Sequence, residues 1–399
     1  MAGTRRKPGR IGPHVEGFRA RLLAVGYTAG TVRNVLKDVG RLGRWMDRED
    51  VTVGDLNPAV IARFLGELRA RGTRRVPSVR SFKPLLDYLT GAGVLAEPAV
   101  PATVVEVLLA DYRKWLVIDR GLAASTVLRY EKLARRLLGE HASEDGGLLV
   151  EELTGAHVVA FVVREVTRVS IGAAKGRVTE LRSLLRFLYL TGRTRSPLAS
   201  AVPPVAGWHD TGVPATIAAS DVQRLLDSCD RTSLIGIRDL AILMLVARLG
   251  LRSAEVARLE LGDIDWRAGQ IAVRGKGRRS DRLPLPCDVG QALTDYLSKA
   301  RPATPLRSVF LSCKAPVRCI RPDLVSNVTR RACDRAGLRR VGAHRLRHAL
   351  AAELLRRGAT LVAVSQVLRH RDLATTAIYA KVDLDALRKV AQPWPGAVR

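Results

Sequence analysis

The sequence predicts a mostly α-helical protein with one small antiparallel β-sheet in its C-terminal part. Apolar residues recur every three or four positions along most of the 399 residues, which is the spacing of amphipathic helices. Between Asp263 and Pro286 the pattern changes to strand-like alternation, and a Gly-Lys-Gly turn joins Gln270–Arg274 to Asp281–Leu285. The length allows two or three domains, and 47% hydrophobic residues suffice for their cores.

Two copies of one helical unit account for the first half of the chain, over residues 14–96 and 104–200. Similar residues recur in the same order at a separation of 95 to 99 positions, and each copy is expected to contain four or five helices. The paired anchor residues include Gly26 and Gly121, Leu56 and Leu153, Phe64 and Phe161, and Leu89 and Leu188.

Proline-rich stretches separate the units and set the predicted domain boundaries. Proline lacks an N–H group and clashes with the preceding helical turn, so the prolines of 97–101 and 196–214 should end helices. We therefore predict a basic tail at 1–13, the two helical units, and a third domain at 215–399. In that third domain, Ser220–Asp221 should cap its first helix, and further helices are expected around 236–249 and 253–260.

A large excess of positive charge predicts a polyanionic partner. The chain has 66 Lys and Arg against 38 Asp and Glu, giving a net charge of +28. The excess occurs in every part of the chain rather than in one tail. Although an Arg-rich composition also follows from genomic base composition, this distribution favours double-stranded DNA as the partner.

Several other classes of protein find little support in the sequence. The apolar stretch Leu240–Val246 is far shorter than the roughly 20 residues of a membrane span, which predicts a buried helix and no membrane partner. The basic run Thr4–Lys7 lacks the apolar segment of a signal peptide. The five cysteines form no CxxC pair, which suggests reduced thiols, and we expect a cytoplasmic protein.

No cofactor, nucleotide or metal ion is expected. The segment around Lys276 lacks the GxxxxGK[ST] spacing of a phosphate-binding loop. His344 and His348 lie on one predicted helix, but no carboxylate or cysteine follows at a spacing that would complete a metal site.

Six residues of the C-terminal third make up a complete set for chemistry on a phosphodiester. Arginines are fixed donors for phosphate oxygens, lysine and histidine can transfer protons, and a tyrosine can attack phosphorus. The six are Arg252, Lys276, His344, Arg347, His370 and Tyr379.

Each of these residues has an ordinary structural explanation when taken alone. Arg252 could form a common salt bridge with Glu255 at a helix junction where Ser253 caps the second helix. Lys276 could be a solvated charge, and a tyrosine such as Tyr379, with its pKa near 10, is usually a half-buried core residue. His348, next to the His344 face, is interpreted as a supporting residue.

The order and context of the six resemble the tyrosine recombinases, or phage-type integrases. The resemblance covers the third domain: the Arg252 box with Glu255, the Gly-Lys-Gly hairpin, His344-x-x-Arg347, a Leu-x-His segment and Ile-Tyr-Ala-Lys-Val. It implies an α+β tyrosine recombinase catalytic domain. The two helical units resemble, less specifically, the SAM-like core-binding domain that precedes it.

The resemblance also implies a role for each of the six residues. Tyr379 would attack the scissile phosphate and form a 3′-phosphotyrosyl link, and Arg252 and Arg347 would stabilise the phosphoryl charge. Lys276 would protonate the leaving 5′-oxygen. His344 would assist proton transfer, and His370, separated from Tyr379 by a turn containing Thr376, would hydrogen-bond the phosphate.

Three features depart from the usual family pattern. The helical unit is duplicated, the β-type arm-binding domain of some integrases is not found, and Arg369 occupies a position that is usually glycine. We expect neither of the last two to touch a catalytic position. The duplication leaves the DNA footprint open, and Lys175 and Arg177 are the predicted DNA contacts in the second unit.

The predicted function is site-specific recombination for integration, excision or transposition of a mobile element. The resemblance implies a homotetramer acting on two DNA sites, with possible accessory proteins, and association with the nucleoid when bound to DNA. Two alternatives stay open at this point: DNA relaxation like that of a type IB topoisomerase, and a DNA-binding accessory protein that does not cleave.

Overall fold

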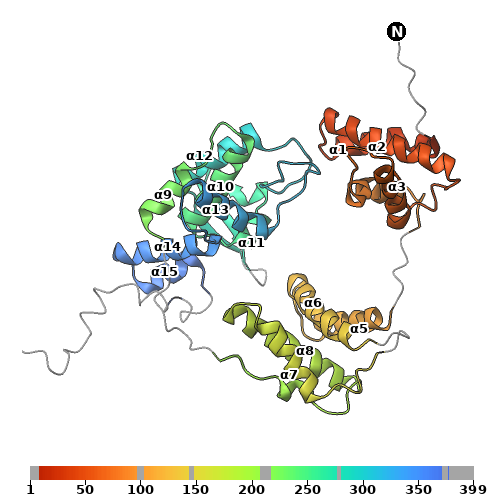
Figure 1. Cartoon of the computed structure of the whole chain (residues 1–399). Helices are drawn as coiled ribbons and strands as arrows, with labels where there is room; N and C mark the ends of the chain where they lie inside the picture. Colours follow the sequence, from red (N-terminus) through yellow and green to blue (C-terminus); the bar gives the residue numbers. More distant parts are fainter. Residues whose placement is uncertain are drawn as a thin grey trace, which may run out of the picture. The chain divides into compact units, whose positions relative to one another are not determined.

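Helices make up most of the structure, with one three-stranded antiparallel sheet among the described residues, so the predicted fold class is confirmed (Figure 1). The computed structural model describes residues 9–96, 103–142, 148–206, 217–275, 280–370 and 376. These residues belong to two compact units, one combining Met1–Leu95 with Asp210–Arg399 and the other spanning Ala96–His209.

The first predicted helical unit folds as four α-helices with two short 3-10 turns. Its core is a separate cluster of buried side chains between Ile11 and Leu95. The helices are α1 (Val15–Ala24), α2 (Ala29–Arg48), α3 (Pro58–Ala70) and α4 (Lys83–Gly91), and the 3-10 turns are Gly9–His14 and Val79–Phe82.

The second predicted helical unit also contains four α-helices around a core of its own, between Leu108 and Val202. They are α5 (Val104–Ile118), α6 (Ala124–Glu140), α7 (Gly155–Val166) and α8 (Ile171–Leu190), followed by a 3-10 turn at Leu198–Ala201.

The anchor residues of the predicted repeat take matching places in the two helical units. Gly26 and Gly121 both have positive φ, +88° and +57°, in the turns before α2 and α6. Phe64 on α3 and Phe161 on α7 are each 2% exposed. The helix starts match as well, since Asn57 caps α3 and Thr154 caps α7 through their side-chain oxygens.

The C-terminal part combines helices with a small sheet, of which one strand contributes Ile271 and Val273 to the core. Its core lies between Leu225 and Leu346, and a smaller cluster lies between Ala351 and Leu368. The α-helices are α9 (Ala219–Asp227), α10 (Leu234–Leu249), α11 (Ser253–Arg258), α12 (Cys287–Asp295), α13 (Pro322–Arg335), α14 (Ala343–Arg356) and α15 (Leu361–Leu368), with helical turns at Leu261–Asp263 and Tyr296–Ala300.

The predicted hairpin is confirmed, and one further short strand extends its sheet. The strands β1 (Ile264–Asp265), β2 (Gln270–Arg274) and β3 (Ser280–Pro284) lie in the order β1-β2-β3, and both pairs are antiparallel. Arg274 pairs with Ser280, so the segment with Lys276 connects two paired strands. Lys276 itself lies outside the described residues.

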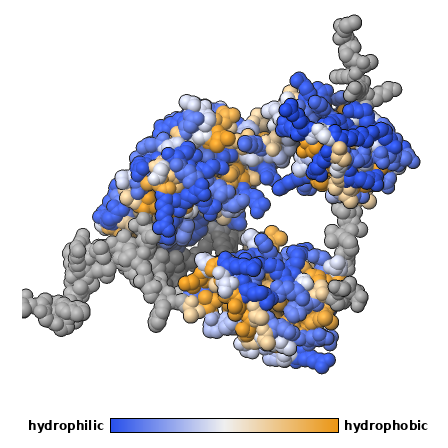
Figure 2. Space-filling view, in the orientation of Figure 1, coloured by the Kyte–Doolittle hydropathy of each residue, from blue (hydrophilic) through white to orange (hydrophobic). Residues whose placement is uncertain are grey.

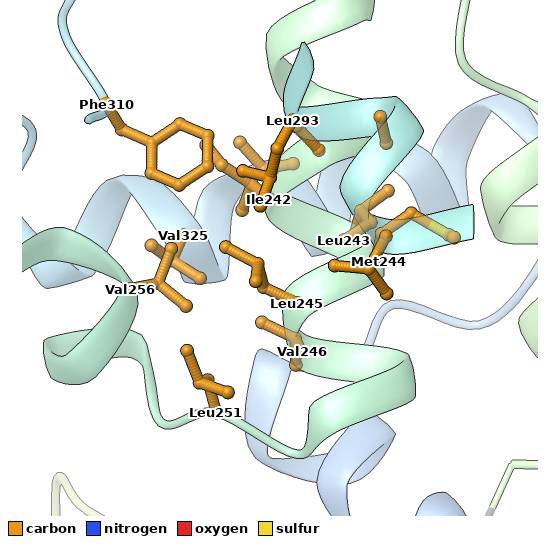
Figure 3. Close-up of a cluster of buried hydrophobic side chains, with 14 of the residues drawn as sticks. Ile242, Leu243, Met244, Leu245, Val246, Leu251, Val256, Leu293, Phe310 and Val325 are labelled. Atoms are coloured by element: carbon orange, nitrogen blue, oxygen red, sulfur yellow. The ribbon is translucent and has the colours of Figure 1, made fainter. Parts of the chain in front are cut away.

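Helix α10 is the buried helix predicted from its apolar run. Ile242, Leu243, Leu245 and Val246 are each 0% exposed and pack among side chains from α11, α12 and α13 (Figure 3). None of the helices in the described part of the chain is long and apolar enough to span a membrane. The C-terminal end of α10 is thereby fixed, which matters because candidate site residues follow it directly.

The predicted cap of α9 was wrong. The helix begins at Ala219, and the N-cap is Ala218, whose backbone is extended and whose side chain makes no cap bond. Asp221 instead lies in the first turn, where its carboxylate accepts a 2.9 Å hydrogen bond from Arg224. An acidic group there also interacts favourably with the helix dipole, so Asp221 stabilises the helix start without being its cap.

Hydrophilic residues cover much of the surface in the view of Figure 2, as expected for a chain with a net charge of +28. The exposed large hydrophobic side chains of the described residues lie mostly between Val104 and Leu190. The second helical unit therefore presents more apolar surface than the first.

We predict that Phe64→Ala and Phe161→Ala each destabilise only their own helical unit, by about 3–5 kcal/mol, because each ring fills a separate core. Hydrogen exchange of the full chain, read by peptide, would measure both effects. Faster exchange of α5–α8 in the Phe64→Ala variant would contradict the independence of the two cores.

Candidate active site

The junction between α10 and α11 positions Arg252. Gly250 ends α10 in the left-handed conformation, with φ 60° and ψ 30°, and Arg252 is the extended N-cap of α11. The carboxylate of Glu255 accepts the Arg252 backbone N–H at 2.8 Å and its Nη1 at 2.7 Å. The predicted Arg252–Glu255 pair is confirmed.

The predicted cap of α11 was wrong by one residue. Ser253 is the first helical residue, and Arg252 is the cap because its carbonyl accepts the N–H groups of Glu255 and Val256. Glu255 thus bonds both the backbone and the side chain of Arg252. The Arg252 side chain stays 43% exposed while that of Glu255 is 5% exposed, so the guanidinium has access to solvent and its partner does not.

Arg347 on α14 is a buried cation that connects three helices. It is 1% exposed, and its Nη1 and Nη2 donate to the carbonyl oxygens of Gly250 and Leu368. Gly250 ends α10 and Leu368 ends α15, so one guanidinium bonds the C-terminal ends of two helices. Such ends carry partial negative charge, which favours a cation there.

Three histidines lie around these arginines. His344 and His348 are one turn apart on α14, and their rings meet edge to face with centroids 4.2 Å apart. His344 is exposed and His348 is partly buried. The Nδ1 of His370, just after α15, lies 2.7 Å from the Oγ1 of Thr376. Thr376, expected in a turn, is helical and completely buried.

The surroundings of these histidines keep the rings neutral. Burial, followed by the charge of Arg347, lowers the pKa of His370 to about 4. Burial and the neighbouring His344 lower the pKa of His348 to about 4. The pKa of His344 is also lowered, first by partial desolvation and then by Arg347 and Arg252. A neutral imidazole can accept a proton or donate one hydrogen bond.

The expectation that Arg369 touches no candidate catalytic position was wrong. Arg369 ends α15 in the left-handed conformation, with φ 53° and ψ 47°. This conformation turns its side chain back, so that Nη2 donates to Glu255 Oε2 at 2.9 Å and to the Gly250 carbonyl at 3.4 Å. The Arg369 carbonyl in turn accepts a 3.4 Å hydrogen bond from Arg252.

The charges around Glu255 do not cancel. Burial raises the pKa of the Glu255 carboxyl, but the Arg252 backbone N–H and the charge of Arg369 more than offset that effect, so the pKa is lowered overall. Glu255 is therefore ionised at neutral pH. One carboxylate faces Arg252 and Arg369, and the charge of Arg347 adds to theirs. The cluster is positively charged, as a site for a phosphodiester requires.

The structure brings Arg252, His344, Arg347 and His370 together with Glu255 and His348. Lys276 and Tyr379 lie outside the described residues. Sequence reasoning did not assign the carbonyls of Gly250 and Leu368, because main-chain groups leave no sequence signal. It treated Thr376 as a turn residue. The contacts of Arg369 were also missed, although the sequence carries a sign of them: an arginine occupies a position where the family usually has glycine.

The predicted DNA contacts in the second helical unit remain predictions. Lys175 and Arg177 lie in the first two turns of α8 and are partly buried. Arg177 Nη1 lies 3.7 Å from Glu165 and 4.0 Å from Glu180, so part of its charge is already balanced. Within the described ranges, no group of three His, Cys, Asp or Glu residues could hold a metal ion.

We predict that Gly250→Ala destabilises the C-terminal part by more than the roughly 1–2 kcal/mol cost of a left-handed alanine. An added Cβ would lie 2.8 Å from Leu368 Cδ2 and 3.1 Å from Leu350 Cδ2. Gly337→Ala is the matched control, because Gly337 has a φ of +66° with nothing within 4 Å of the added carbon. Urea unfolding would compare them, and equal losses would contradict crowding at Gly250.

We predict that stability falls as the pH is lowered from about 6.5 toward 4, partly through His348. Its folded pKa of about 4 lies below the unfolded value near 6.5, so the unfolded chain binds more protons in this window. Below both values the effect is complete. Unfolding midpoints at pH 7.5 and 5 should differ less in His348→Gln than in the parent, and an equal difference would refute this origin.

Sequence and structure comparisons agree with this geometry. Residues 215–385 match the Phage integrase family. A putative integrase/recombinase, y4rA, of Sinorhizobium fredii is 39% identical over 99% of this chain and 97% of its own length. The tyrosine recombinase XerD of Mycobacterium tuberculosis is 31% identical, over 72% of this chain and 96% of its own length.

The solved structure of the XerH site-specific recombinase, in a post-cleavage complex with its difH substrate, has the same fold. It covers 74% of this chain and 97% of its own, with a TM-score of 0.54 and 18% identity. With a full-length relative at 39% identity and the arginine and histidine motifs brought together in space, the chain belongs to the phage integrase family of tyrosine recombinases.

Proposed function

We propose that this protein is a site-specific DNA recombinase that cleaves and rejoins strands through a 3′-phosphotyrosyl intermediate. The observation that carries the proposal is the convergence of Arg252, His344, Arg347 and His370 on one positively charged site. These residues are up to 118 positions apart in sequence, counting from Arg252 to His370. Random surface charges would not share partners in this way.

The two arginines would stabilise the negative charge that develops on the phosphoryl oxygens. Arg252 is the exposed member, fixed by Glu255 at both its backbone and its guanidinium. Arg347 is the buried member: two main-chain carbonyls accept from its Nη1 and Nη2, so in this arrangement it would act on the phosphate through its charge. Donors fixed before the reaction stabilise a transition state without the cost of reorganisation.

The histidines would transfer protons and hold the phosphate. Because the pKa of His344 is lowered, its ring is neutral at pH 7 and can accept the proton of the attacking tyrosine. His370, with one nitrogen at Thr376 Oγ1, would contact a phosphate oxygen. Thr376 precedes Tyr379 by three positions, so this bond joins His370 to the segment that leads to the proposed nucleophile.

Tyr379 would attack phosphorus as its proton leaves, and Lys276 would give a proton to the departing 5′-oxygen. The new bond joins the tyrosine oxygen to phosphorus, and the broken bond frees a 5′-hydroxyl. Attack by a different 5′-hydroxyl reverses the step and releases the tyrosine. The energy of the phosphodiester is kept in the protein link, so the cycle needs no nucleotide.

The proposed partner is double-stranded DNA, bound by a homotetramer acting on two sites. The XerH relative is solved as a complex with its DNA substrate, which supports DNA as the partner here. The helical units at 14–96 and 104–200 would contact the DNA, with Lys175 and Arg177 among the contacts. Integration, excision or transposition of a mobile element is the proposed outcome. Accessory proteins are proposed as further partners, and the DNA-bound protein is proposed to associate with the nucleoid.

We predict that the parent protein forms a covalent adduct with DNA and that Tyr379→Phe forms none. The substrate is a pool of duplexes with a randomised core and a nick, from which the short strand diffuses away after cleavage and traps the adduct. Sequencing the trapped duplexes identifies the site. Arg252→Gln should lower the rate of adduct formation by about 10²–10³, as loss of one oxyanion donor does.

Assays of strand exchange, plasmid relaxation and adduct formation with the same protein distinguish the three competing functions. Strand exchange between two unnicked duplexes that carry the identified site supports a recombinase, whereas relaxation of supercoiled plasmid without exchange supports a topoisomerase. DNA binding with no adduct that depends on Tyr379 would leave a non-cleaving accessory protein and refute the proposal.

A further inference from the structure

Arg369 adopts an arrangement that is costly for an arginine. Its φ of 53° places it in the left-handed region, which glycine adopts freely and residues with a Cβ adopt only at a cost. Asp50 is the only other non-glycine residue with positive φ in the described part of the chain. The buried Nε of Arg369 has no hydrogen-bond partner among the described residues. The backbone conformation alone would favour glycine at this position.

The benefit of Arg369 lies in its charge next to Glu255. The two side chains are 6% and 5% exposed, so they form a desolvated pair with an N–O distance of 2.9 Å. Glu255 also bonds Arg252, whose side chain is 43% exposed. Without Arg369, Glu255 and Arg252 would be a neutral pair, and Arg252 would attract a phosphate weakly. With Arg369, the buried carboxylate is already balanced and Arg252 remains a net cation.

We propose that Arg369 is a positioning residue for strand cleavage, which acts through Glu255 to hold Arg252 in place and to leave its positive charge available to the scissile phosphate. The inference rests on the proposed function of the site. Arg369 is buried, so it acts through Glu255 and not by touching DNA. Its main chain contributes too, because its carbonyl accepts the Nη2 of Arg252.

The test compares Arg369→Gly and Arg369→Lys with the parent, in the full chain. Glycine removes the charge and relieves the left-handed strain, while lysine keeps the charge. Asp50→Gly is the matched control, because it relieves the same strain at an exposed position. Three quantities are measured: the rate of adduct formation at saturating trapped duplex, the affinity for that duplex in a Tyr379→Phe background, and the midpoint of thermal unfolding.

Arg369→Gly is expected to lower the rate about tenfold or more, somewhat less than the 10²–10³ of a lost direct donor. Duplex affinity should change less than about threefold, because many phosphate contacts share it. Loss of the buried pair with Glu255 lowers stability while glycine relieves the backbone strain, so the rates are compared at a temperature well below both unfolding midpoints. Arg369→Lys should recover part of the rate. The proposal would be overturned if Arg369→Gly formed the adduct at the parent's rate. It would also be overturned if unfolding of the variant accounted for the whole loss of rate.

The double variant with Glu255→Gln keeps the test decisive if Arg369→Gly folds poorly. If Arg369 acts through Glu255, then Arg369→Lys should alter the rate less in the Glu255→Gln background than in the parent, since a neutral partner no longer needs balancing. Independent, multiplicative effects would overturn the proposal.

Inorganic phosphate separates this proposal from the proposed function. Phosphate should raise the unfolding midpoint of the parent. The rise should be smaller in Arg252→Gln, and the difference between the two rises measures phosphate binding at the site. Arg369→Gly should reduce that binding. If the parent forms no tyrosine-dependent adduct but the phosphate effect depends on Arg369, the proposed function fails and the charge balance stands. If the phosphate effect is equal in Arg369→Gly, the inference fails.

Discussion

The arrangement of the candidate site depends on one buried cation, the guanidinium of Arg347. A charge that is 1% exposed is stable only when polar groups surround it, and here the carbonyls of Gly250 and Leu368 accept its hydrogen bonds. Those carbonyls lie at the ends of α10 and α15, and Arg252 and His370 each come two positions after them. Satisfying Arg347 therefore also brings Arg252 and His370 together.

Left-handed backbone at two helix ends makes this arrangement possible. Gly250 and Arg369 both have φ near +55°, which reverses the chain sharply after α10 and α15. Glycine does this without strain, but an arginine adds a side chain that returns to Glu255. The second helix end thus provides a turn and a charge at once. This combination explains why one buried carboxylate can serve two arginines.

Much of the fold and part of the candidate site could be predicted from the sequence. The period of apolar residues gave α10 and the hairpin strands, because burial on one face determines both. The spacing of His344 and Arg347 placed them on one helix. The cap at Ser253 was wrong because Glu255 bonds the residue before it, and the contacts of Arg369 could not be foreseen because they depend on the backbone conformation of a single residue.

The separate hydrophobic cores of the helical units and the C-terminal part have an evolutionary consequence. The side chains that fill the core between Leu108 and Val202 differ from those that support Arg347. Substitutions on the surface of α5–α8 can therefore accumulate without altering the free energy that holds the arginines. Selection can retune one part of such a chain while the other part drifts.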